Sequence, residues 1–195
     1  MVKTSENAHA DGRRVRSERS REAIKKAMID LMADGIREPT AQLVSERAGV
    51  GIRTVFRQFD DMGSLIHSIH QDLIERNSPI LQTTLTEGTK EERLDSAIEA
   101  RHKLYTINRE TFLSTYGLMW KYDSLKQNYA DLNHRLKKRM FLSLHELKTA
   151  SETDKNFAEM MLSFETWNRL IRHQGLSPDD AKAIIRNQVL PLLKP

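Results

Sequence analysis

Apolar residues recur at helical spacing along almost the whole chain. The segment from about residue 17 to residue 34 shows this most clearly, with one side formed by Ile24, Ala27, Met28, Leu31 and Met32. Gly35 then ends the predicted helix, because glycine readily adopts the left-handed conformation that stops one. No segment alternates apolar and polar residues as a strand does, so the pattern predicts an all-α protein.

Two short helices joined by a tight turn are predicted between residues 39 and 59. Pro39 disfavours helix at the residue before it, and Thr40 is a suitable N-cap for the first helix. Gly49 provides a left-handed turn residue, and Val50 fills the space between the helices. The apolar side of the first short helix consists of Leu43, Val44 and Ala48. Such a segment is typical of a helix-turn-helix, and the alternative is an ordinary helical hairpin with a solvated arginine face.

The second short helix is predicted to have one apolar side and one outward side. We expect Val55, Phe56 and Phe59 to pack inward. The outward side then consists of Ile52, Arg53, Thr54 and Arg57. Arginine on an outward helix face, next to a tight turn, is the arrangement that a helix entering a DNA groove requires.

The rest of the chain is predicted to be helical, with short breaks. A helix from Met62 to about Arg76 is expected to end at Asn77-Ser78-Pro79, and a long helix is expected from about Leu125 to Thr149. Dense apolar spacing from Phe157 to Ile171 predicts one further helix, and Ser177 caps the last one. Other breaks are expected at Gly88, Asn108, Ser124, Ser151 and Gly175.

Composition narrows the class of protein. The 195 residues suffice for one small and one larger domain, and only 8 Gly and 5 Pro favour helix throughout. The absence of Cys excludes disulfides, zinc fingers and thiol catalysis. No apolar run has the length of a membrane span, and the first residues lack a signal-peptide core. We therefore expect a cytoplasmic protein that does not use a membrane as a partner.

Positive charge is concentrated near the N-terminus, although the net charge is only +4. Between Arg13 and Lys26, seven basic residues face two acidic ones, which suits a surface for phosphates. Residues 1–16 are polar and aperiodic, and we interpret them as a disordered basic arm that either tracks a minor groove or remains a solvated tail. The second basic run is interpreted as a solvated helix face, and it consists of Arg135, Lys137, Lys138 and Arg139.

Catalytic motifs are weak. Glu99 and His102 have the Glu-x-x-His spacing of di-iron bundles, but the only other copy lies within the predicted arm. His67 and His70 are interpreted as surface histidines, and the chain has neither a phosphate-binding loop nor a Gly-x-Ser-x-Gly motif. We expect no enzyme activity, no catalytic residue, no metal site and no cofactor. An all-helical metal-dependent enzyme using Glu99 and His102 is kept as an alternative.

The segment from about Ser17 to Leu73 resembles the DNA-binding domain of the tetracycline-repressor (TetR) family of transcriptional regulators. The resemblance rests on Thr40, on Ala48-Gly49-Val50 and on Phe56-Arg57-Gln58-Phe59. It implies a helix-turn-helix DNA-binding domain over residues 17–61 and a helical ligand-binding and dimerisation domain over residues 62–195. Two positions depart from the pattern, because the family usually has tyrosine in place of Phe56 and lysine in place of Met62.

The resemblance implies a homodimeric repressor that binds a double-stranded DNA operator and is released by a small-molecule effector. Arg53 is the first candidate for reading a base, since arginine pairs with the O6 and N7 atoms of guanine. Ile52 is a candidate for contact with a thymine methyl group, and Phe56 occupies a position that meets DNA in the family. The candidate phosphate contacts are Thr40, Thr54 and Arg57, with Gln42 as a weaker one. A non-specific DNA-binding or interaction module is the other alternative.

The C-terminal half supplies two further sets of candidates. An effector pocket is expected to be lined by His102, Tyr105, Phe112, Tyr116, Met119 and Trp120, although such a stripe also suits plain core. By resemblance, the last two helices form the dimer interface, with Phe157, Met161, Phe164, Trp167, Ile171, Ile184 and Val189 as candidate contacts. The alternative is that both helices are buried within one subunit.

Overall fold

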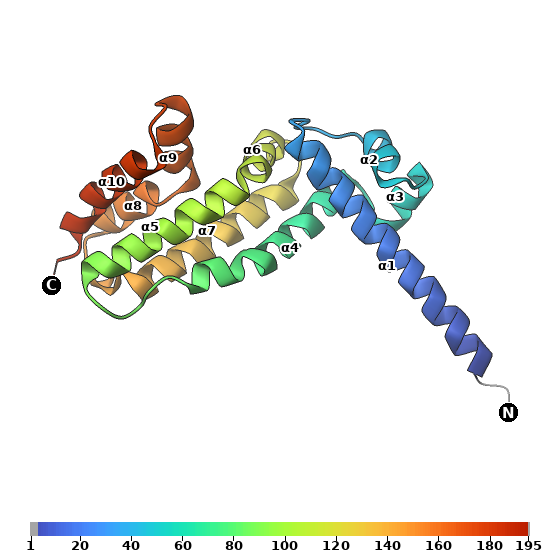
Figure 1. Cartoon of the computed structure of the whole chain (residues 1–195), viewed down its shortest axis with the longest axis horizontal. Helices are drawn as coiled ribbons and strands as arrows, with labels where there is room; N and C mark the ends of the chain where they lie inside the picture. Colours follow the sequence, from blue (N-terminus) through green and yellow to red (C-terminus); the bar gives the residue numbers. More distant parts are fainter. Residues whose placement is uncertain (1–3, 195) are drawn as a thin grey trace. The chain divides into compact units, whose positions relative to one another are not determined.

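The chain is helical along nearly its whole length (Figure 1). The computed structural model describes the backbone of residues 4–194 and the side chains of residues 12–73 and 75–194. This described part contains no strand, which confirms the all-α prediction. Within residues 4–194, no helix is both long enough and apolar enough to cross a membrane.

Two compact units make up the fold. The first unit takes the chain up to Leu73 together with Leu113–Asn128, and the second takes Ile74–Phe112 and the chain from Tyr129 onward. The sequence predicts a division at residue 61, whereas the first unit extends beyond it. The reason is that apolar residues of later helices complete its core.

The first unit is built around α1 (Thr4–Ala33), α2 (Ala41–Ala48) and α3 (Ile52–Gln58). The start of α4 (Met62–Gln82), the end of α6 (Arg109–Leu118) and the start of α7 (Asp123–Ser143) add to it. Its fully buried core includes Ile24, Met28, Leu31, Val44, Val55, Phe59, Leu65, Ile66, Ile69, Leu118 and Leu125. The three-helix domain inferred from the sequence is therefore present, and it is anchored on a longer fourth helix.

The N-terminal segment differs from the expectation of a disordered arm. Residues 4–16 continue α1, and the side chains of Arg16 and Ser20 donate hydrogen bonds to the carbonyls of Gly12 and Arg16. Once packing around Ile24 fixes the later turns, each further residue adds one backbone hydrogen bond without a new nucleation cost. Residues 1–3 of the expected arm lie outside the described residues.

Helix α4 continues through Pro79, so the break predicted at Asn77-Ser78-Pro79 is wrong. Proline removes one backbone donor, and such a loss is tolerated where neighbouring contacts hold the helix. One such contact is the bond from Asn77 Nδ2 to Asn108 Oδ1, at 3.2 Å. The helix ends three residues later, where the Thr83 hydroxyl donates to the Ile80 carbonyl.

The second unit packs α5 (Lys90–Ile107) beside the later part of α7, as Figure 1 shows. The remaining elements are α8 (Glu152–Met161), α9 (Phe164–Asn168), a π-helical turn (Arg169–His173), α10 (Pro178–Val189) and short 3-10 helices at His145–Lys148 and Leu190–Leu192. The core of this unit includes Leu94, Ile98, Met140, Leu144, Leu147, Ala158, Ile185 and Val189. Thr89 and Glu92 form a reciprocal cap that starts α5 after Gly88.

Two long helices expected in this unit are interrupted. Helix α7 ends at Ser143, not Thr149, and a 3-10 turn follows it. The helix expected across Phe157–Ile171 breaks after Met161, and Ser163 caps a new helix by accepting from the Thr166 N–H at 3.2 Å. At the break, the carbonyl of Leu162 accepts from Arg101 and from the Tyr105 hydroxyl, so the free helix end has partners.

A buried arginine holds the second unit together at the start of α5. Arg93 is only 2% exposed, and its guanidinium pairs with the Glu146 carboxylate. The same group donates to the backbone carbonyls of Ser143 and Gly88. These bonds join α5 to the chain that follows α7, and no sequence pattern indicated them.

Candidate nucleic-acid interface

The turn between α2 and α3 has the geometry that the sequence predicts. Gly49 adopts φ 66° and ψ 30°, and its N–H bonds to the Glu46 carbonyl at 3.2 Å. The N–H of Val50 bonds to the Ser45 carbonyl at 3.1 Å, which satisfies another carbonyl at the end of α2. At the other end of α2, the Thr40 hydroxyl oxygen accepts from the Leu43 N–H at 3.2 Å. The helix-turn-helix prediction is confirmed in these details.

Gly49→Ala is expected to lower the free energy of unfolding by about 1 kcal/mol, because an alanine in the left-handed region is strained. A Cβ atom at Gly49 would meet no atom within 4 Å, so the loss comes from the backbone alone. Gly117→Ala is the matched control, because that site is equally open and has ordinary helical backbone. It should leave stability unchanged or raise it by up to about 1 kcal/mol. Urea unfolding of both variants measures the difference, and equal losses would contradict the assignment.

Helix α3 is held on the first unit by its apolar side. Val55 and Phe59 are buried in the core of that unit, as the sequence predicts. Phe56 differs from the expectation, because its side chain points outward and is 51% exposed. Val55 and Phe59 define the inward side of this seven-residue helix. Phe56 follows Val55 directly in the chain, so its side chain leaves the helix on a different side. Leu43 on α2 is likewise exposed, contrary to the prediction.

Arg21 of α1 positions α3, a role that sequence analysis missed. Its guanidinium donates to the carbonyl of Gln58 at the end of α3 at 2.8 Å, and to the Ser68 hydroxyl at 3.1 Å. It also lies 4.2 Å from the centre of the Phe59 ring, where a cation is attracted by the ring face. Ser17 accepts a bond from the Gln58 amide at 2.8 Å. Because these contacts join residues far apart in the sequence, the sequence indicates only the positive charge of Arg21.

The exposed face of α3 consists of Ile52, Arg53, Phe56 and Arg57. Ile52 is 40% exposed, and the two arginines have no ion-pair partner among the side chains that the structure describes. Two arginines that form no ion pair among the described side chains, next to two exposed apolar groups, form a surface suited to a polyanion with apolar base edges. The structure thus brings the main sequence-predicted candidates together on one face.

The remaining DNA-contact candidates have other partners or less exposure. The Gln42 amide donates to the Glu46 carboxylate at 2.6 Å, so a DNA contact would compete with that bond. The Thr40 hydroxyl is exposed and keeps its hydrogen for a phosphate while its oxygen caps α2. Thr54 is half-buried on the edge of α3. Their phosphate contacts stay predictions.

Apart from Arg21, the basic residues of α1 divide into two groups. Lys25 is buried and pairs with Asp72 at 2.7 Å, and Lys26 pairs with Asp30 at 2.6 Å. The other group is exposed and has no ion pair with any side chain that the structure describes; it consists of Arg13, Arg14, Arg16 and Arg19. This exposed group retains the charge that a phosphate surface needs.

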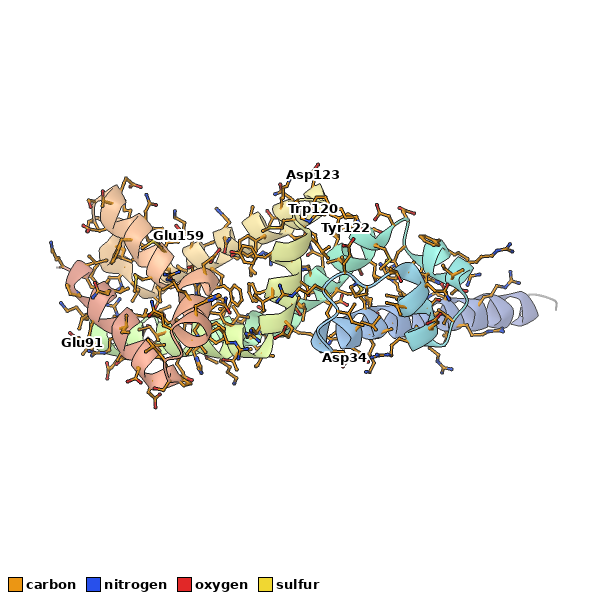
Figure 2. All side chains as sticks on the ribbon, turned by 90° about the horizontal axis from the view of Figure 1, so that it is seen from above. Asp34, Glu91, Trp120, Tyr122, Asp123 and Glu159 are labelled. Atoms are coloured by element: carbon orange, nitrogen blue, oxygen red, sulfur yellow. The ribbon has the colours of Figure 1, made fainter. Side chains whose placement is uncertain are left out.

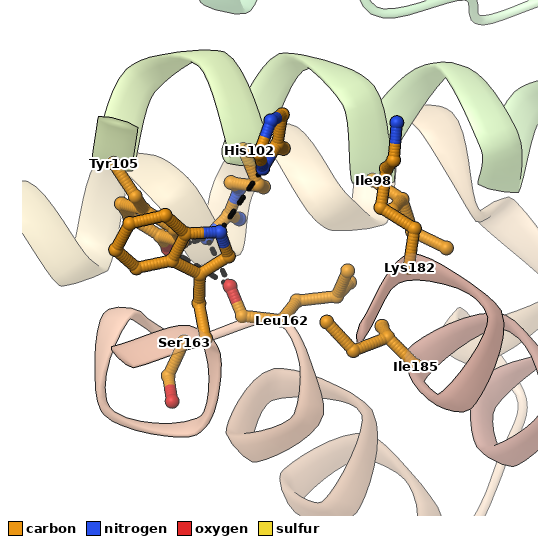
Figure 3. A pocket seen from close by; sticks show the side chains of 9 residues that line it. Ile98, His102, Tyr105, Leu162, Ser163, Lys182 and Ile185 are labelled. Carbon is orange, nitrogen blue, oxygen red and sulfur yellow. Dashed lines mark hydrogen bonds between the residues drawn. The ribbon is translucent and has the colours of Figure 1, made fainter. Parts of the chain in front are cut away.

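Half of the predicted effector pocket lies in the second unit. His102, Tyr105 and Phe112 join two residues assigned to the dimer interface, Phe164 and Trp167, in one aromatic cluster. The rings of Phe112 and Phe164 stack with centroids 4.4 Å apart, and the Trp167 ring N–H donates to His102 Nδ1 at 3.1 Å. Figure 3 shows the adjoining cavity, whose free volume of about 10 Å³ suits a single water. These residues form packed core, which was the stated alternative.

The other three pocket candidates belong to the first unit. Met119 packs against its core, and Tyr116 is half-buried. Trp120 is 76% exposed and lies beside Tyr122 in the turn after α6 (Figure 2). The expectation of a core-facing Trp120 is wrong, because α6 ends at Leu118 and the helical spacing does not extend to it.

Most of the predicted dimer contacts are covered by their own chain. Met161, Phe164, Trp167 and Val189 are buried within the second unit, so they have little surface for a partner. Phe164 and Trp167 lie on α9, the new helix that begins after the break at Leu162, and Val189 lies on α10. Ile184 is exposed, and Phe157 and Ile171 are half-buried.

The residues of the alternative metal site have other partners. The Glu99 carboxylate pairs with Lys182 at 3.1 Å, and His102 accepts the bond from Trp167. Among the side chains that the structure describes, no group of three or more His, Asp or Glu is arranged to hold a metal ion. The described side chains therefore do not assemble the site that the Glu-x-x-His spacing suggests.

His70 is buried in the first unit, although the sequence suggested a surface histidine. Its Nε2 lies 2.7 Å from the Thr115 hydroxyl, which joins α4 to α6. Burial, together with a smaller contribution from the charge of His67, lowers the pKa of His70 to about 4. His70 is therefore neutral at neutral pH.

Acid is expected to destabilise the protein through His70. Because the pKa of His70 is about 4 in the folded protein and about 6.5 in the unfolded chain, the unfolded chain binds the extra proton between these values. Stability is then complete above pH 6.5 and falls by about 2 kcal/mol from pH 7 to pH 5. Urea unfolding of His70→Gln should lose this pH dependence, whereas His67→Gln should keep most of it. Equal pH dependence in both variants would contradict the assignment.

Comparison with known proteins finds the same fold in solved structures. No protein-family model matches the chain, and no curated protein matches its sequence. Among solved structures, a transcriptional regulator from Rhodococcus sp. Rha1 is 15% identical, with a TM-score of 0.67 over 91% of this chain and 95% of that one. A protein assigned to the TetR family from Rhodococcus sp. is 14% identical, with a TM-score of 0.69 over 90% and 99%.

A third structure, assigned to the TetR family from Mesorhizobium loti, is 13% identical, with a TM-score of 0.62 over 91% of this chain and 94% of that one. At these identities the likeness concerns the fold. The chain has the fold of these regulators along nearly its full length, including the helix-turn-helix.

Proposed function

We propose that this chain, which has the fold of TetR-family regulators, is a sequence-specific DNA-binding transcriptional regulator that acts as a homodimer. The observation that carries the proposal is the exposed face of α3. Its arginines are unpaired among the described side chains, and its opposite side is fixed in the core. A rigid helix with unpaired arginines, directly after a tight turn, fits the major groove of DNA.

Selection of DNA by the full-length protein tests the proposal. The protein is incubated with a library of random 30-base-pair duplexes, and bound duplexes are amplified and sequenced. We expect enrichment of a palindrome whose half-sites lie about one helical turn apart, as a symmetric dimer requires. Recovery of random sequences would instead favour a non-specific DNA-binding module.

Exposed apolar residues of the second unit support dimerisation. Met160 on α8 and Ile184 on α10 are exposed, and Phe157 and Ile171 retain part of their surface. We assign the interface to these four residues in place of the buried residues that the sequence suggests. Sedimentation of the full-length protein should give a dimer, and Ile184→Asp should shift it towards monomer.

Repression and release by a small molecule complete the proposal. A cavity of about 330 Å³ in the second unit lies between α5, α7, α8 and α9, within the size range of small-molecule sites. Its polar lining includes Arg101, Asn133, Asn156 and Thr166. Release requires that an effector bind more tightly to a dimer whose α3 helices are wrongly spaced for the operator. An effector found by thermal shift should weaken DNA binding, and Asn156→Trp should abolish both effects.

A further inference from the structure

The exposed face of α3 is divided into two parallel rows. Arg53 and Arg57 are four residues apart and form a cationic row, and Ile52 and Phe56 form an apolar row beside it. Residues with this spacing are neighbours on a helix surface. Because α3 has only seven residues, a partner that contacts its exposed face contacts both rows.

Phe56 is the unusual member of this face. Its neighbours Val55 and Phe59 are buried, whereas half of the Phe56 side chain and much of Ile52 remain in contact with water. Single exposed apolar residues are common on protein surfaces. Two of them lie beside arginines that form no ion pair with any described side chain, on a helix whose opposite side is buried. This arrangement favours a partner that carries negative charge and apolar groups side by side.

The major groove of DNA offers this combination. Phosphates line it, guanine presents two acceptors, and the C5-methyl group of thymine is the apolar group on the base edges. Phe56 also lacks a hydroxyl, so it has no donor for a phosphate. An aromatic ring exposed on this face is therefore suited to a methyl group on a base and not to the DNA backbone.

We propose that Ile52 and Phe56 read thymine by contact with its C5-methyl group, so that each operator half-site holds a thymine close to the guanine bound by Arg53. This inference rests on the proposed function. Because neighbouring residues on a helix are about 5–6 Å apart and base pairs are about 3.4 Å apart, the thymine lies within about two base pairs of that guanine. Contact of the apolar row with thymine methyl groups adds sequence specificity that the cationic row alone does not provide.

Uracil substitution tests the inference by removing one methyl group at a time. The duplex bound most tightly in the random-library selection is resynthesised with each thymine replaced in turn by deoxyuridine, and binding of the full-length protein is measured at constant salt. At one or two positions in each half-site we expect affinity to fall about fourfold. This factor corresponds to the free energy of burying one methyl group, which uracil lacks. Substitution in both half-sites should give about sixteenfold.

Protein variants assign the effect to the apolar row. Phe56→Ala or Ile52→Ala should reduce the preference for thymine over uracil to less than about 1.5-fold at the base pair that each side chain contacts. Leu142→Ala, which removes an exposed apolar side chain on α7, should keep the full preference. Circular dichroism of each variant checks that the helices remain folded. Phe56→Leu retains an apolar group and should keep part of the preference.

The outcomes separate this inference from the proposed function. If a sequence is enriched but every thymine tolerates uracil within about 1.5-fold, the inference is overturned and sequence-specific binding stands. A preference for thymine that persists in both alanine variants also overturns it, because another group then reads the methyl. If no sequence is enriched, the proposed function itself fails, and the inference fails with it.

Discussion

Arg53→Ala is expected to abolish the preference for one base pair in each half-site of the operator. Arg53 lies on the exposed face of α3 and has no ion-pair partner among the described side chains, so its guanidinium is available to pair with guanine O6 and N7. Such a pair contributes about 1–3 kcal/mol of discrimination, which is about 5- to 150-fold in each half-site. Binding to a duplex series with single base substitutions, at constant salt, measures the loss.

Arg57→Ala is the matched comparison, because it removes the same charge one helical turn later. If Arg57 contacts a phosphate, its removal should weaken binding to all sequences alike. The slope of log affinity against log salt concentration should also become smaller by about one for each phosphate contact that is lost. If Arg53→Ala also weakens every sequence equally, then Arg53 is a phosphate contact and base reading belongs to another side chain.

Arg93→Ala is expected to lower the free energy of unfolding by about 3–5 kcal/mol, the range for removing one partner of a buried ion pair. The substitution leaves the Glu146 carboxylate without its cation and the Ser143 and Gly88 carbonyls without a donor. The free energy of unfolding of small domains is about 5–15 kcal/mol in total, so we expect this variant to be barely stable. Urea unfolding followed by circular dichroism measures the loss.

The double variant Arg93→Met with Glu146→Met tests the cause of that loss. Replacement of both partners by apolar side chains of similar volume removes the stranded charge, and it should recover most of the stability. Arg135→Ala, an exposed arginine on α7, should change stability by less than about 0.5 kcal/mol. A double variant less stable than Arg93→Ala would show that the loss comes from packing and not from the charge of Glu146.

Local sequence signals predicted the helix-turn-helix correctly. Thr40, Gly49 and Val50 act through bonds to residues only three to five positions away, and such bonds depend little on the rest of the chain. Pro39 acts on the residue directly before it. The helical periodicity of α1 also predicted its buried side, because apolar residues at this spacing lie on one side of the helix and that side packs against the core.

Features that depend on long-range contacts were not predictable. Phe56 was expected inward, and only the packing of Val55 and Phe59 decides which side of a seven-residue helix is covered. Arg21 contacts residues that lie far along the chain, so its role in positioning α3 has no local signal. The helix break at Leu162 depends on Arg101, which supplies the partner for the free carbonyl.

If α3 reads a DNA sequence, the protein binds its operator much more tightly than DNA of another sequence, and the ratio of the two affinities can be measured. Affinity of the full-length protein is measured at one salt concentration for the selected duplex and for a shuffled duplex of the same base composition. We expect a ratio of at least about 1,000, the lower end for sequence-specific regulators. A ratio near one would contradict it, because phosphate contacts alone bind both duplexes equally.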